Sequence, residues 1–136
     1  CSSDLEGDER SLRVLCDALE TEDPRLIGPP DGVARVHGDL WSGNVRWSRR
    51  GCVLIDPCAH GGHRESDLAM LALFGLAFLD EVLDAYHEEW PLNEGWKTRV
   101  PLHQLYPLLV HAILFGGSYP EAVARVTRDV LERVNL

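Results

Sequence analysis

Residues 36–57 constrain the fold of this 136-residue chain more than any other stretch. Glycine, aspartate and asparagine crowd residues 37–44, which predicts an irregular loop. Two short strand-like segments, Val45–Trp47 and the apolar Cys52–Ile55, then flank the polar turn Ser48–Gly51. Apolar runs on either side of a tight turn are typical of a β-hairpin. We therefore expect one small hairpin directly after a loop that is rich in polar side chains.

Most of the remaining chain has the apolar spacing of helices. We expect helices over residues 4–20, 68–74, 79–90, 102–115 and about 120–134, and a short strand over 33–36. The first helix has the apolar stripe Leu12, Leu15, Cys16 and Leu19, and the last has Val123, Val126, Val130 and Val134. Pro107 predicts a bend in its helix, and Ser118 with Glu121 predicts a capping box. The expected fold class is mainly α with a small β-hairpin.

Composition argues against several classes of partner. The formal net charge of −9 argues against nucleic acid, whose phosphates require basic patches. The apolar run over residues 68–79 is too short to span a membrane and ends at Asp80. No signal peptide is recognisable, so we expect a cytoplasmic protein. Cys16 on its helical stripe and Cys52 at the start of an apolar strand are expected to be buried thiols.

Three side chains around the hairpin match the needs of phosphoryl transfer to an alcohol. That reaction requires a carboxylate that orients the hydroxyl and accepts its proton, and oxygen ligands for Mg²⁺. Asp39 and Asn44 share one loop, and the hairpin returns Asp56 beside Asn44. Protein kinases have a catalytic Asp, a metal-binding Asn and a metal-binding Asp in this order. Turn capping by these residues is the simpler alternative, but it explains their order less economically.

The segment His37–Asn44, HGDLWSGN, resembles the catalytic loop of the aminoglycoside phosphotransferase-like kinases, within the protein-kinase-like superfamily. Its central residues are similar to those of the fructosamine (ketosamine) kinase branch. Gly62–Met70 and Phe115–Tyr119 resemble the same branch. The resemblance covers roughly residues 34–119. It implies the C-terminal lobe of a kinase-like fold.

The resemblance also implies a role for individual residues. Asp39 matches the catalytic base, and Asn44 and Asp56 match the ligands of Mg²⁺ or Mn²⁺, with ATP as the co-substrate. His37 and Asp67 match residues that brace the catalytic loop. For His37 we expect packing and backbone hydrogen bonding rather than proton transfer. For Asp67, a simple place at a helix N-terminus is the alternative.

Trp41 and His60 bear on the identity of the acceptor. Trp41 is a candidate wall of the substrate pocket, and a place in the core or at an interface explains it equally well. His60 stands where the branch usually has an aromatic residue, which leaves the substrate open. A transition-metal site formed by Asp56, His60 and His63 is a weaker alternative to the magnesium site.

The parts of a kinase that hold ATP are missing from this sequence. No glycines before the catalytic loop have the spacing of a phosphate-covering loop, and no lysine precedes it. The single lysine, Lys97, comes after the metal-binding positions. The chain also begins with Cys1 and no Met. We therefore expect residues 1–136 to be one domain, the C-terminal lobe, in a chain that lacks the N-terminal ATP-binding lobe.

Three functions remain open. The first is the catalytic lobe of an ATP- and Mg²⁺-dependent kinase that phosphorylates a sugar hydroxyl of a fructosamine, free or bound to protein. The second has the same chemistry with an aminoglycoside or another amino-alcohol as acceptor. The third is a non-catalytic interaction module derived from such a kinase. A missing lobe exposes apolar surface, so a homodimer is among the expected partners.

Overall fold

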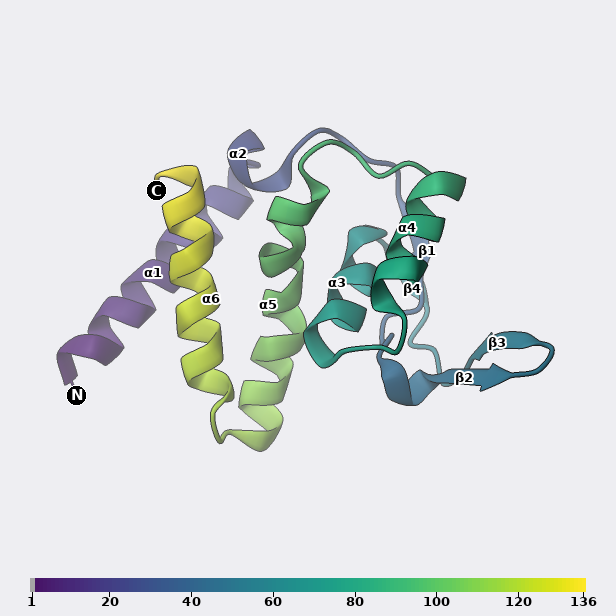
Figure 1. The fold of residues 1–136 in the computed structure, drawn as a ribbon. Helices are drawn as coiled ribbons and strands as arrows, with labels where there is room; N and C mark the ends of the chain where they lie inside the picture. The colour runs from purple at the N-terminus through teal and green to yellow at the C-terminus, as the bar shows by residue number, and fades with distance from the viewer. Residues whose placement is uncertain (1) are drawn as a thin grey trace. The chain divides into compact units, whose positions relative to one another are not determined.

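The computed structural model describes the backbone of residues 2–136 and the side chains of residues 6–136. These residues fold into two compact units (Figure 1). The first unit comprises the residues up to Pro30 together with Lys97–Leu136, and the second comprises Asp31–Trp96. That residues 1–136 form one lobe stays a prediction.

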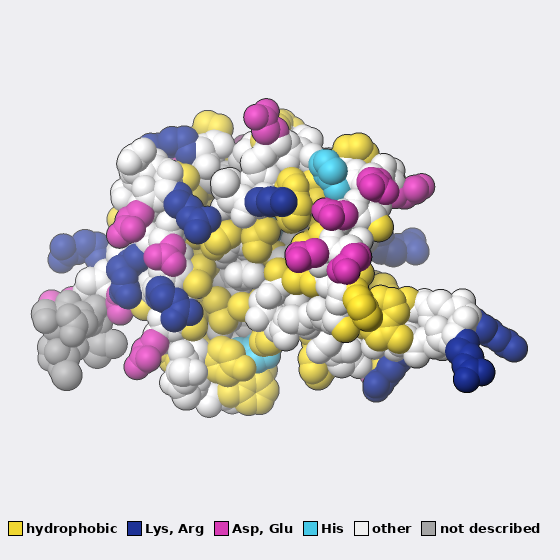
Figure 2. Space-filling model, in the orientation of Figure 1, with side chains coloured by type: hydrophobic (Ala, Val, Ile, Leu, Met, Phe, Trp, Pro, Cys, Tyr) yellow, Lys and Arg dark blue, Asp and Glu magenta, His cyan; other side chains and the backbone are white. Residues whose placement is uncertain are grey.

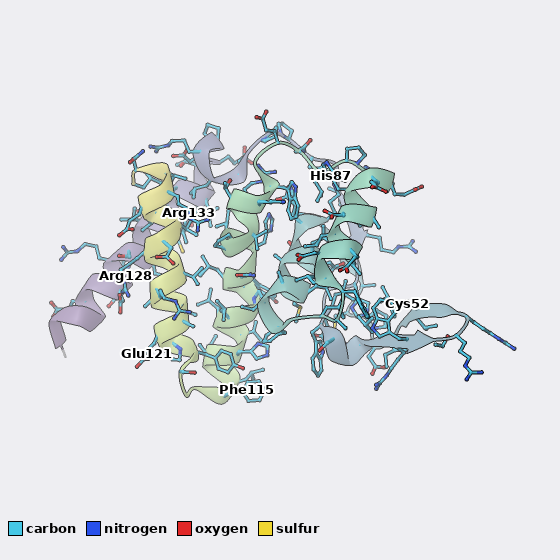
Figure 3. The ribbon with its side chains drawn as sticks, in the orientation of Figure 1. Cys52, His87, Phe115, Glu121, Arg128 and Arg133 are labelled. Carbon is cyan, nitrogen blue, oxygen red and sulfur yellow. The ribbon has the colours of Figure 1, made fainter. Side chains whose placement is uncertain are left out.

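The first unit is entirely helical. Its elements are α1 (Ser2–Glu20), α2 (Pro24–Ile27), α5 (Trp96–Phe115), whose first residue belongs to the second unit, and α6 (Tyr119–Val134). Helices α1, α2 and α6 pack together, with Leu15, Leu26 and Val130 among their buried side chains. An ion pair between Asp8 on α1 and Arg128 on α6 adds to this contact. Figure 3 labels Arg128 on α6. The four helices agree with the mainly helical fold class that the sequence predicts.

Three expectations for the first unit were wrong. Cys16 is exposed rather than buried, because Leu15 alone takes the deeply buried place on this turn of α1. Ser118 makes no side-chain cap hydrogen bond to α6. Its φ of −88° and ψ of −3° are helical, whereas a capping serine has an extended backbone. Helix α5 also begins earlier than predicted and contains both Pro101 and Pro107.

The second unit combines two short antiparallel ladders with two helices. Its elements are β1 (Ala34–Val36), the 3₁₀ turn η1 (Ser42–Asn44), β2 (Val45–Ser48), β3 (Gly51–Leu54), β4 (His60–Gly62), α3 (Glu65–Phe74) and α4 (Leu79–Glu89). Strands β2 and β3 form the predicted hairpin, with Val45 opposite Leu54. Strands β1 and β4 form a second ladder, with Val36 opposite His60. No sequence pattern predicts β4, because two of its three residues are glycine.

The core of the second unit packs against the loop of residues 37–44. Leu40, Val45 and Leu71 are buried together, and Leu76 and Leu79 pack against them. Leu40 comes from the loop itself, so packing fixes the loop from within. Cys52, however, is exposed, which corrects the expectation of a buried thiol. The hairpin of β2 and β3 is a two-stranded ladder whose β3 residues are all exposed.

Helix α4 presents an acidic surface, visible in Figure 2 as the cluster of acidic side chains over this helix. Its exposed acidic residues are Asp80, Glu81, Asp84, Glu88 and Glu89. Nδ1 of His87, in the last turn of α4, accepts a hydrogen bond of 3.0 Å from the N–H of Leu92 beyond the helix, which fixes the return of the chain. Among the described residues, no helix is long and apolar enough to cross a membrane.

Candidate active site

Asp39 and Asn44 are joined directly. The side-chain amide of Asn44 donates to the main-chain oxygen of Asp39 at 2.8 Å and to its carboxylate Oδ2 at 3.1 Å. Asn44 is only 6% exposed, whereas Asp39 is partly accessible to solvent. The Asn44 N–H also donates to the carbonyl of Trp41 at 2.9 Å, which closes the short turn η1. The five-residue offset seen in the sequence therefore becomes a local contact that orients the Asp39 carboxylate.

Ile55 connects this loop to Asp56. Its N–H donates to the Asn44 carbonyl at 3.0 Å, and its carbonyl lies 2.8 Å from His37 Nε2. The Asp39 N–H in turn donates to His37 Nδ1 at 3.3 Å. Both bonds hold if Nε2 carries the ring proton and Nδ1 accepts. The His37 ring thus links the loop of Asp39 to the peptide bond just before Asp56, and both ends of Ile55 are held.

Asp67 holds the start of the same loop. Its two carboxylate oxygens accept hydrogen bonds from the His37 N–H at 2.6 Å and the Gly38 N–H at 3.0 Å. Asp67 lies in the first turn of α3, thirty residues away along the chain. Gly38 is required here, because its φ is +82° and a Cβ would overlap the Cys58 carbonyl. The loop backbone is therefore fixed by a carboxylate and by a close approach that only glycine permits.

Asp56 follows β3 in a left-handed conformation with φ of +50°. Aspartate adopts this region more readily than most residues, and such conformations cluster at functional sites. Its side chain is exposed. The backbone bonds at Ile55 bring the chain leading to Asp56 next to Asn44. The carboxylate of Asp56 and the side-chain amide of Asn44 thus come from two segments that lie next to each other.

Trp41 lies over the glycine that precedes Asn44. Its side chain is 42% exposed, and a Cβ added to Gly43 would overlap its indole ring. The ring is thus packed on one side against the backbone at Gly43 and remains accessible on the other. This arrangement is compatible with a pocket wall, and it excludes a fully buried core position.

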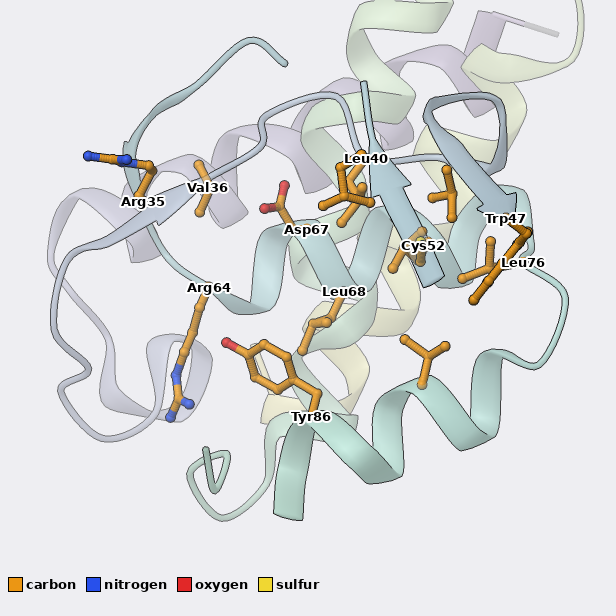
Figure 4. A pocket seen from close by; sticks show the side chains of 14 residues that line it. Arg35, Val36, Leu40, Trp47, Cys52, Arg64, Asp67, Leu68, Leu76 and Tyr86 are labelled. Carbon is orange, nitrogen blue, oxygen red and sulfur yellow. The ribbon is translucent and has the colours of Figure 1, made fainter. Parts of the chain in front are cut away.

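An apolar cavity of about 280 Å³ lies beside the loop, between the hairpin and α3 and α4 (Figure 4). Leu40, Val45, Leu68 and Leu71 line its buried part. Asp39, Asn44, Asp56 and Trp41 are not among its lining residues. The cavity is therefore distinct from the polar cluster, and its apolar walls do not suit a metal ion or a phosphate.

The alternative transition-metal site does not form. Among the residues that the structure describes, Asp56, His60 and His63 do not come together as a three-ligand group. The His60 ring instead bonds the Cys58 carbonyl through Nδ1 at 2.8 Å. It also lies against Gly38, where an added Cβ would approach the ring within 3.0 Å.

Arg64 is a residue of this region that the sequence reasoning missed. It immediately precedes α3 and forms a buried ion pair of 2.8 Å with Asp31. The Arg64 guanidinium, through its hydrogen bond, holds the pKa of the Asp31 carboxyl below its ordinary value. The sequence signal was present, because Arg64 lies within the family-like stretch Gly62–Met70. Its partner could not be read from a chain separation of 33 residues.

Comparison with known proteins agrees with this geometry. A family model described as fructosamine kinase matches residues 20–133. The chain belongs to the fructosamine kinase family. A protein of Enterococcus faecium named a probable ketoamine kinase is 44% identical over 126 residues, which cover 92% of this chain and 44% of that protein. The ketosamine-3-kinase of Mus musculus is 35% identical over 125 residues, covering 91% of this chain and 40% of that protein.

A solved structure also matches. The crystal structure of a Thermobifida fusca protein assigned as a fructosamine-3-kinase superposes with a TM-score of 0.85 at 56% identity. The match covers 93% of this chain and 42% of that one. The kinase-like fold class is thereby confirmed. The chain spans less than half the length of these family members, so the activity of a whole fructosamine kinase is a proposal for this chain.

Proposed function

We propose that this chain is the catalytic part of a kinase that transfers a phosphoryl group from ATP to a sugar hydroxyl of a ketoamine adduct. The observation that carries the proposal is the hydrogen-bonded pair of Asp39 and Asn44, tied through Ile55 to Asp56. Asp39 would accept the proton of the acceptor hydroxyl, since its carboxylate is partly accessible and oriented. Family membership supports the reaction class and the ketoamine as acceptor.

The residues present fit a magnesium ion. The two atoms bonded to the Asn44 side chain are the main-chain oxygen and Oδ2 of Asp39, and both are hydrogen-bond acceptors. The Asn44 atom that faces them must therefore be its NH₂ group. The Asn44 Oδ1 is then directed elsewhere and is available as a ligand. Together with the exposed carboxylate of Asp56, it gives the hard oxygen donors that Mg²⁺ prefers. When bound, the ion would shield the charge of the phosphates.

Positioning by the chain's own residues would supply the rest of the catalysis. Asp67 holds the N–H groups of His37 and Gly38, and the His37 ring holds the N–H of Asp39, which limits the motion of the Asp39 carboxylate. Trp41 would wall the acceptor pocket with its accessible ring face. The acidic surface of α4 suits an acceptor that carries an amine. We propose that the residues gripping ATP belong to the part of the relatives' length that this chain does not span.

The proposal is tested by measuring the kinase activity of the longest protein that the gene of this chain encodes. Asp39→Asn keeps the side-chain size but removes the proton acceptor, so kcat on a fructosamine should fall about 10²- to 10⁴-fold. The KM for ATP should change little. Asp129→Asn, an exposed acid on α6, is the matched control and should keep the full rate.

Three outcomes contradict parts of the proposal. If Asp39→Asn keeps full rate on a fructosamine and an aminoglycoside, Asp39 is not the base. If only the aminoglycoside is phosphorylated, the acceptor is wrong and the chemistry stands. If the unsubstituted protein phosphorylates neither, the non-catalytic alternative is favoured. The 136-residue chain alone is expected to bind ATP poorly and to show negligible transfer.

A further inference from the structure

Arg64 is a buried arginine that the proposed reaction does not use directly. Its side chain is 9% exposed. Its Nε donates to Asp31 Oδ2 at 2.8 Å, Nη1 to the Trp90 carbonyl at 3.1 Å and Nη2 to the Pro91 carbonyl at 2.8 Å. The guanidinium carbon lies 6.0 Å from the centre of the Trp90 ring. A buried charge is tolerated when it is paired and hydrogen-bonded, and here every nitrogen of the guanidinium has an acceptor.

These bonds gather three segments around the start of α3. Asp31 precedes β1, Trp90 and Pro91 follow α4, and Arg64 itself precedes α3. Arg64 makes no side-chain cap bond to its own helix, because a guanidinium has only donors and cannot accept from the first N–H groups of α3. Its donors are directed at the other two segments. Burial opposes the charge, but hydrogen bonds to Asp31 and Tyr86 raise the pKa of Arg64 above its ordinary value. The guanidinium therefore stays charged.

Arg64 and Asp67 together hold both ends of residues 31–38, the segment that leads into the catalytic loop. Before β1, Asp31 is bound by Arg64. After β1, the N–H groups of His37 and Gly38 are bound by Asp67. Arg64 and Asp67 are three residues apart, and Figure 4 shows their side chains leaving the start of α3 in opposite directions. The two side chains are thus a pair of clamps on residues 31–38.

We propose that Arg64 is a positioning residue for the catalytic loop. By fixing Asp31 and the first turn of α3, Arg64 keeps Asp67 in register with the His37 and Gly38 N–H groups, and so places Asp39. The catalytic meaning of this inference rests on the proposed function, but the positioning itself does not. A lysine cannot replace the arginine fully, because its compact ammonium lacks the planar fork that reaches separate acceptors.

The test is hydrogen exchange of single backbone amides, measured by NMR on the 136-residue chain without ATP or acceptor. In Arg64→Met, exchange at His37 and Gly38 should accelerate at least tenfold. The amides of the β2–β3 ladder and of Gly75, at the end of α3, should change less than twofold. The matched control is Arg35→Met, because Arg35 is an exposed arginine on β1. It should leave all of these amides unchanged.

Two results overturn the inference. One is unchanged exchange at His37 and Gly38. The other is equal acceleration at every amide, which means general destabilisation and no specific positioning. If Arg64→Met does not fold, Arg64→Lys decides, and it should accelerate the same two amides by a smaller factor. The exchange experiment does not measure phosphoryl transfer. A negative exchange result therefore leaves the proposed kinase function standing. An inactive enzyme likewise leaves the positioning role of Arg64 standing.

Discussion

Replacing Asp67 with asparagine should loosen the catalytic loop in a way whose size follows from the structure. The two carboxylate oxygens accept the His37 and Gly38 N–H groups at 2.6 and 3.0 Å. Asparagine has one oxygen, so it satisfies one N–H and opposes the other with its own NH₂. A hydrogen bond to a charged group contributes about 1.5–3 kcal/mol, and an unsatisfied donor costs about 1–3 kcal/mol. We expect the free energy of unfolding to fall by about 2–4 kcal/mol in Asp67→Asn.

The assay is urea unfolding followed by tryptophan fluorescence. All four tryptophans, Trp41, Trp47, Trp90 and Trp96, lie in the second unit, so the signal reports the part of the chain that contains Asp67. Asp84→Asn, an exposed acid in the middle of α4, is the matched control and should change stability by less than about 0.5 kcal/mol. A loss below about 0.5 kcal/mol in Asp67→Asn, or an equal loss in the control, would refute the reasoning.

Two further predictions concern Asp56 and Asp31. Asp56→Asn and Asp56→Ala should both weaken Mn²⁺ binding in calorimetry, but only alanine should also lose about 1 kcal/mol of stability, because asparagine tolerates the left-handed backbone. Equal free energies of unfolding for Asp56→Asn and Asp56→Ala would contradict the effect expected from the left-handed backbone. The lowered pKa of Asp31 stabilises the fold above its unfolded value of about 3.9, and this stability is lost as pH falls through the folded value. The difference in urea midpoint between the parent and Asp31→Asn should therefore shrink between pH 5 and pH 2, and a constant difference would contradict it.

The loop that carries Asp39 and Asn44, and the hairpin after it, were predictable because the information for them is local. Asp39 and Asn44 lie five positions apart, and a tight turn of four residues is enough to return the chain to Asp56. Their polarity, with glycines between them, specifies a loop, and the flanking apolar runs specify a hairpin. The helices followed from apolar spacing, although their ends shifted where proline was tolerated in α5.

What the sequence determined was the set of chemical groups and their order; how they are held was decided by tertiary structure. The carboxylate of Asp67 meets two N–H groups about thirty residues away, and Arg64 meets Asp31 across 33. The short strand β4 exists because β1 lies beside it, since two glycines have little strand preference of their own. Exposure of Cys16 and Cys52 likewise depends on which neighbours pack against them. Contacts between distant segments are set by packing of the whole unit, and no local pattern encodes them.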